Sequence, residues 1–127
     1  MTKTIDNLTK NLIYISETDA PIIPFTLDNA AAVTAAEVLR QTGHEARETV
    51  ETVDADAFFA RLTTIREWFG PREKKTAERF AALKVELENE LIDLKVFKIG
   101  KIQVDIYVVG LDKKGRLAGV KTKAVET

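Results

Sequence analysis

The sequence has no cysteine, one histidine and one tryptophan in 127 residues. Without cysteine the chain can form neither a disulfide framework nor a thiolate nucleophile, which is compatible with a reducing cytosol. An excess of charge of one sign is also absent, since 19 Lys and Arg residues balance 20 Asp and Glu residues. A chain with so little net charge gives no reason to expect DNA, RNA or an anionic membrane as a direct partner.

Long apolar runs are missing as well. No stretch approaches the roughly 18 consecutive apolar residues of a membrane span, and the first residues lack the apolar centre of a signal peptide. The composition, 45% hydrophobic and 31% charged, is typical of a globular core with a well-solvated surface. We therefore expect one domain over residues 1–127, located in the cytoplasm.

The first half of the chain has the periodicity of helices. Residues 4–15 predict a helix, because four apolar residues fall on one of its faces: Ile5, Leu8, Leu12 and Ile15. A second helix is predicted over residues 34–43. Thr34 and Glu37 form a capping box at its start, and Gly43 closes its end.

Two further helices are predicted in the middle of the chain. The first spans residues 54–69, with Asp54 or Asp56 as its N-cap. The second spans residues 70–94, with Pro71 in its first turn. Its apolar stripe consists of Ala77, Phe80, Leu83, Leu87, Leu91 and Leu94.

The last third alternates in steps of two and predicts strands over residues 95–100, 101–112 and 116–126, joined by Gly100 and the turn 112–115. Another strand is expected over residues 21–28, at a sheet edge because Pro24 cannot donate a ladder hydrogen bond. Residues 46–53 fit a short strand or an extended loop. Helices should cover both faces of a largely antiparallel sheet, because Tyr107 and Val109 leave its second face partly apolar.

Catalytic motifs are weak. His44 could act as a general base, but a solvated loop residue or a side chain that caps helix carbonyls explains it with fewer assumptions. Asp54 and Asp56 could bind a metal ion, yet helix capping suffices, and the spacing lacks the glycine and closing glutamate of a calcium loop. An enzyme that uses His44 with Asp54 or Asp56 is therefore the third-ranked hypothesis.

Three features could bind a partner. Glu17 lies in the turn "SETDAP", where it could also bond the local backbone. Trp68 stands beside a glycine-proline turn, where core packing and an interface anchor are both open. The last predicted strand runs directly to Thr127, although chain ends usually fray.

Several segments together resemble the nuclease A inhibitor family. They are "ISETDAP", "LRQTGHEA", "VDADAFFARLTTIREWF", "VFKIGKIQVDIYVVG" and "GRLAGVKTKAVET", in the family's order and spacing. The resemblance covers nearly the whole chain and is weakest over the first dozen residues. It implies a three-layer α-β-α sandwich and a cytoplasmic inhibitor of secreted, sugar-non-specific nucleases.

The resemblance also implies the mode of inhibition. The C-terminal threonine of the family, here Thr127, enters the nuclease active site and approaches the catalytic divalent ion. Glu17 and Trp68 match the other two contact residues. The metal would belong to the nuclease, so this chain is expected to need no cofactor and no metal of its own. A monomer that binds one nuclease is the corresponding partner prediction.

An alternative remains open within the same fold. Well-studied inhibitors of this type are acidic after the tryptophan, whereas this chain reads "WFGPREKKTAER". The basic residues Arg72, Lys74 and Lys75 would favour a protein-protein interaction module with a different partner, if binding depended on them rather than on Thr127.

Overall fold

The computed structural model describes residues 3–15 and 19–126. The helices are α1 (Lys3–Thr9), α2 (Ala35–Gln41), α3 (Ala55–Thr63) and α4 (Pro71–Glu90). The strands are β1 (Ile13–Ile15), β2 (Asp19–Pro21), β3 (Ile23–Asn29), β4 (Val50–Val53), β5 (Ile92–Ile99), β6 (Gln103–Leu111) and β7 (Arg116–Val125). None of the helices formed by the described residues is long and apolar enough to cross a membrane.

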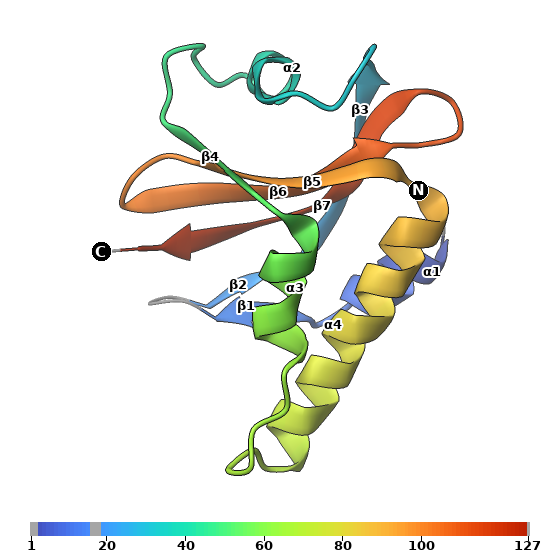
Figure 1. The fold of residues 1–127 in the computed structure, drawn as a ribbon, viewed down its shortest axis with the longest axis vertical. Coiled ribbons are helices and arrows are strands. Elements are labelled where there is room, and N and C mark those ends of the chain that lie inside the picture. The colour runs from blue at the N-terminus through green and yellow to red at the C-terminus, as the bar shows by residue number, and fades with distance from the viewer. Residues whose placement is uncertain (1–2, 16–18, 127) are drawn as a thin grey trace.

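A five-stranded sheet organises the molecule (Figure 1). Its strand order is β3-β7-β6-β5-β4, and every pair of neighbours is antiparallel. The predicted meander β5-β6-β7 is confirmed, and so is the edge position of Pro24, which lies in β3. β1 and β2 form a separate antiparallel pair that contacts β7.

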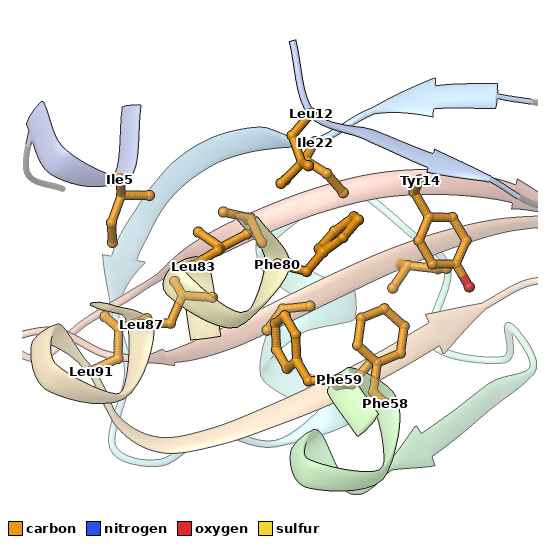
Figure 2. Close-up of a cluster of buried hydrophobic side chains, with 14 of the residues drawn as sticks. Ile5, Leu12, Tyr14, Ile22, Phe58, Phe59, Phe80, Leu83, Leu87 and Leu91 are labelled. Carbon is orange, nitrogen blue, oxygen red and sulfur yellow. The ribbon is translucent and has the colours of Figure 1, made fainter. Parts of the chain in front are cut away.

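Helices cover both faces of this sheet, so the predicted three-layer α-β-α architecture is confirmed (Figure 1). One face packs against α1, α3, α4 and the β1–β2 pair. Figure 2 shows this larger core, in which aromatic rings of α3 and α4 lie against leucine and isoleucine side chains. The other face packs against α2 through a smaller core: Val33, Val38, Leu39, Phe97, Ile99, Tyr107, Val109 and Leu117.

The structure confirms the predicted residues at the helix starts. The Thr34 hydroxyl accepts a hydrogen bond from the Glu37 amide at 3.2 Å, and the Asp54 carboxylate accepts one from the Ala57 amide at 3.0 Å. Pro71 occupies the first turn of α4. Gly43 follows the end of α2 with φ of +78°, the left-handed conformation that glycine adopts most easily.

The first predicted helix is too long. It ends at Thr9, whose hydroxyl donates to the Ile5 carbonyl at 3.0 Å, and Asn11 then takes a left-handed φ of 60°. Residues 13–15 form β1 instead, as suits two isoleucines and a tyrosine. Leu12 keeps its predicted place in the core, although it reaches it from outside the helix.

Two other boundaries are corrected. The helix predicted over residues 54–69 ends at Thr63, because Thr64 is already extended with ψ of 122°, and Trp68 therefore lies in a loop. The helix predicted to residue 94 ends at Glu90, and Leu91 is extended with ψ of 150°. Leu94 thus belongs to β5. The strand predicted over residues 21–28 is divided between β2 and β3 around Ile22, whose amide donates to the Leu12 carbonyl at 3.0 Å.

Gly119 in β7 leaves no room for a side chain beside β6. A Cβ atom added there would lie 1.8 Å from the carbonyl oxygen of Val108, which is a backbone atom and cannot swing away. The pairing of Val109 with Gly119 therefore requires a residue without a side chain.

Replacement of Gly119 by alanine should lower the free energy of unfolding by about 3 kcal/mol, because the central strands must separate to admit the methyl group. Gly43→Ala is the control, since a Cβ there meets nothing within 4 Å and only the left-handed φ opposes it. That control should cost about 1–2 kcal/mol. Urea unfolding measures both losses, and a smaller loss for Gly119→Ala than for Gly43→Ala would contradict this account.

Candidate functional site

Trp68 lies in the loop of residues 64–70 that joins α3 to α4, at the lower end of the molecule in Figure 1. Its side chain is 79% exposed, so it does not belong to the core. The ring meets Phe69 edge-on at 6.3 Å between centroids, and the Arg66 guanidinium lies 5.9 Å from its centre. The Phe69 amide donates to the Arg66 carbonyl at 3.0 Å, which closes a turn around the ring. The loop thus presents a large apolar surface in a defined position.

The end of β7 is held up to the last described residue. Val125 pairs with Gln103 in the sheet register, and the Glu126 amide donates to the Ile102 carbonyl at 2.8 Å. The Glu126 carboxylate also pairs with the Lys98 ammonium at 3.0 Å. Because the Lys98 side chain is only 13% exposed, water screens this pair less than an ordinary surface ion pair. Thr127 itself lies outside the described residues.

Glu17 lies outside the described residues too. The strands that flank it, β1 and β2, are held by pairing with each other and by a contact with α3. β1 and β2 pair through three positions, the last of which joins Ile15 to Asp19. Tyr14 stacks on Phe58 of α3 with ring centroids 5.8 Å apart and planes at 6° (Figure 2). This stacking fixes the β1–β2 pair on the helical layer.

A groove of about 560 Å³ separates the β1–β2 pair from the first half of α4. We call it the β1–α4 groove. Its first wall is formed by Asn11, Leu12, Ile13, Ile15 and Asp19, and its second by Arg72, Lys75, Thr76 and Arg79. Since β1 and β2 contact β7 on their other side, the order across the molecule is β7, the β1–β2 pair, the groove and the start of α4. Trp68 precedes α4 by three residues.

His44 is engaged by partners that the sequence did not indicate. Its Nε2 atom lies 2.9 Å from a carboxylate oxygen of Asp105, and its Nδ1 atom lies 2.7 Å from the Thr42 hydroxyl. Both ring nitrogens thus have hydrogen-bond partners, and the ring meets Tyr107 edge-on at 6.0 Å. Burial, and next the nearby Asp105 carboxylate, raise the pKa of Tyr107. This network ties the end of α2 to the sheet.

The two aspartates that the enzyme hypothesis combines with His44 lie elsewhere. Asp54 caps α3, and Asp56 pairs with Lys84 of α4 at 3.0 Å. The hydrogen bond with Asp56 raises the pKa of Lys84. α3 packs on the sheet face opposite to the one that His44 and Tyr107 share with α2, so the structure does not bring the three residues together. Among the described residues, no group of three or more His, Cys, Asp and Glu side chains could hold a metal ion.

Comparison with protein families gives a match over the full length. The model of the family described as nuclease A inhibitor-like protein (NuiA) matches residues 1–127. The chain belongs to this family. A comparison with curated proteins finds no match.

Membership of an inhibitor family implies a protein partner, and its name implies that this partner is a nuclease. The contact roles of Glu17, Trp68 and Thr127 stay predictions. The exposure of Trp68 excludes the core position that the sequence left open, and its role as an interface anchor stays a prediction.

Sequence reasoning missed three supporting residues of the inhibitor-like fold. Lys98 and Asp105 bind partners 28 and 61 residues away in the sequence, a separation at which periodicity carries no information. Arg79 donates to the carbonyls of Leu8 and Lys10, and so joins α4 to the turn before β1. A charged residue within an otherwise apolar strand, such as Asp105 in "VDIYVV", was the available signal.

Replacement of Lys98 by methionine should free the end of β7 while leaving the fold intact. Methionine keeps most of the stem that packs on the sheet but cannot pair with Glu126. Amide hydrogen exchange at Glu126 should quicken several-fold, and the unfolding midpoint should move little. Lys123→Met is the matched control, because Lys123 is exposed and forms no ion pair with another described residue. Equal protection of Glu126 in both variants would show that the backbone bond to Ile102 alone holds this end.

Proposed function

We propose that the protein inhibits a metal-dependent, sugar-non-specific DNA/RNA nuclease by placing Thr127 in the active site, near the catalytic divalent ion. The match of the whole chain to the inhibitor family carries this proposal. The hold on β7 up to Glu126 supports it, since a strand that is already ordered up to the residue before Thr127 loses less entropy on binding.

The chemistry of the last residue fits such a site. A nuclease that uses Mg²⁺ leaves coordination positions for water and phosphate oxygens. The hydroxyl and carboxylate of a terminal threonine are hard oxygen donors and can reach the ion directly or through its water. The ion belongs to the nuclease, so the inhibitor needs neither a metal nor another cofactor.

Glu17 and Trp68 complete the proposed contact. The Glu17 carboxylate would replace a second phosphate charge among the basic groups of the nuclease. Trp68 would bury its exposed ring against the enzyme outside the metal site. On this proposal the protein is a cytoplasmic monomer without catalytic activity. It binds one nuclease molecule and does not itself bind nucleic acid.

The decisive test removes only Thr127. A sugar-non-specific nuclease is assayed in Mg²⁺ with the native chain, with the chain that lacks Thr127 and with a chain that carries two extra residues after it. Inhibition by the native chain should fall at least about a hundredfold in both altered forms, because the metal ligand is lost or displaced. Equal inhibition by all three forms would show that the inhibitory site is not at the terminus.

Replacement of Trp68 by alanine separates binding from folding. The inhibitor should bind about 30-fold more weakly, which corresponds to about 2 kcal/mol of lost contact. Its unfolding free energy should change by less than about 0.5 kcal/mol, because the ring is already in water. A clear loss of stability would instead assign the ring a structural role in the α3–α4 loop.

A second candidate function rests on the cations of the β1–α4 groove. Under this alternative the protein is an interaction module of the same fold that binds a protein other than a nuclease. It would be favoured if no sugar-non-specific nuclease were inhibited by the native chain, while substitutions at Arg72 and Lys75 abolished binding to a protein isolated from the same cell.

A further inference from the structure

We propose that the β1–α4 groove binds an acidic segment of the protein partner. The inference rests on the proposed function in so far as that partner is the nuclease, and it adds a contact apart from Glu17, Trp68 and Thr127. The groove is large enough for several side chains, at about 560 Å³.

The charge of the groove selects an acidic occupant. Arg72, Lys75 and Arg79 line it from α4, and Asp19 on the opposite wall is the one carboxylate among the described residues that line it. Neither Arg72 nor Lys75 forms an ion pair with another described residue, although the chain as a whole carries a formal charge of −1. Positive charge is therefore concentrated at one place on a nearly neutral protein, and a carboxylate brought there gains charge-assisted hydrogen bonds.

The helix that carries these charges is held in place before binding. Arg79 donates to the carbonyls of Leu8 and Lys10, which holds α4 against the turn that leads into β1. Lys75 lies about one turn and Arg72 about two turns earlier on the same helix. Because α4 is also packed into the larger core through Ala77 and Phe80, the wall does not have to form on binding.

The apolar residues of the groove favour a protein segment over nucleic acid. Ile15 is 70% exposed, and Ile13 beside it is partly exposed. Exposed isoleucines are matched by apolar side chains of a partner, whereas a phosphate backbone gains nothing from them. Three cations also fall short of the extended basic surface on which non-specific nucleic-acid binding depends. The occupant is thus an acidic segment with interspersed apolar residues.

The location of the groove agrees with a contact on the nuclease. Ile15 and Asp19 on one wall stand two residues before and two residues after Glu17 in the sequence, and α4 on the other wall begins three residues after Trp68. A partner that contacts both the β1–β2 pair and the α3–α4 loop would come close to the groove. Its acidic segment would then lie beside, and not inside, the basic active site that takes Thr127.

The test reverses two charges in the groove and two outside it. Arg72→Glu with Lys75→Glu changes the groove, and Lys74→Glu with Lys113→Glu is the control with the same net charge. Lys74 and Lys113 are exposed, and neither lines the groove. The probe is a catalytically inactive sugar-non-specific nuclease in Mg²⁺, titrated by calorimetry at low and at physiological salt.

The groove variant should bind at least about tenfold more weakly than the native chain, and the control within about threefold. The affinity of the groove variant should also fall less, or even rise, when salt is added, because two attractive charges have become repulsive. Equal affinities of the groove variant and the control would overturn this inference, while inhibition by the native chain would leave the proposed function standing.

If the native chain binds no such nuclease, the proposed function fails and a second probe tests the groove by itself. The probes are a ten-residue peptide of alternating glutamate and leucine and a single-stranded oligonucleotide of equal charge. Amide NMR shifts at Ile13, Ile15, Arg72 and Lys75 with the peptide, absent in the groove variant, would support the acidic docking site. Shifts with the oligonucleotide alone, or with neither probe, would overturn it.

Discussion

The antiparallel pairing of β7 with β6 and β3 is the constraint on which the rest of the structure depends. β7 is paired on both sides, with β6 over nine positions from Leu117 to Val125. It sends Leu117 into the smaller core and Ala118, Val120 and Ala124 into the larger one. The close approach at Gly119 belongs to the same pairing. One strand therefore contributes to both cores, to the packing of the β1–β2 pair and to the position of the residues up to Glu126.

The three elements to which the proposals assign contacts are each held in place by their own interactions. The end of β7 is held by the Ile102 carbonyl and by Lys98, the β1–β2 pair by the stacking of Tyr14 on Phe58, and α4 by Arg79. Each element is fixed by different bonds, yet all of them lie on the same sheet or on the helices above it. An interface assembled in this way loses little conformational freedom when a partner binds.

Local signals in the sequence predicted much of this architecture. The Thr34 and Asp54 caps, Pro71 in the first turn of α4 and the strand meander were all readable, because each depends on residues a few positions apart. Helix ends were less predictable. Leu12 and Leu91 continue a helical apolar pattern but lie outside the helices, since burial in the same core is possible in either conformation. The partners Lys98–Glu126 and His44–Asp105 come from tertiary packing, and the exposure of Trp68 was likewise fixed by where α3 ends.

The loop position of the single tryptophan has a spectroscopic consequence. The indole is already in contact with water in the folded chain, so unfolding should change its emission maximum little. Burial of the same ring by another protein would shift its emission to shorter wavelengths. Tryptophan fluorescence is thus a poor reporter of folding in this protein. It would instead report, without a label, the binding of a partner that covers the α3–α4 loop.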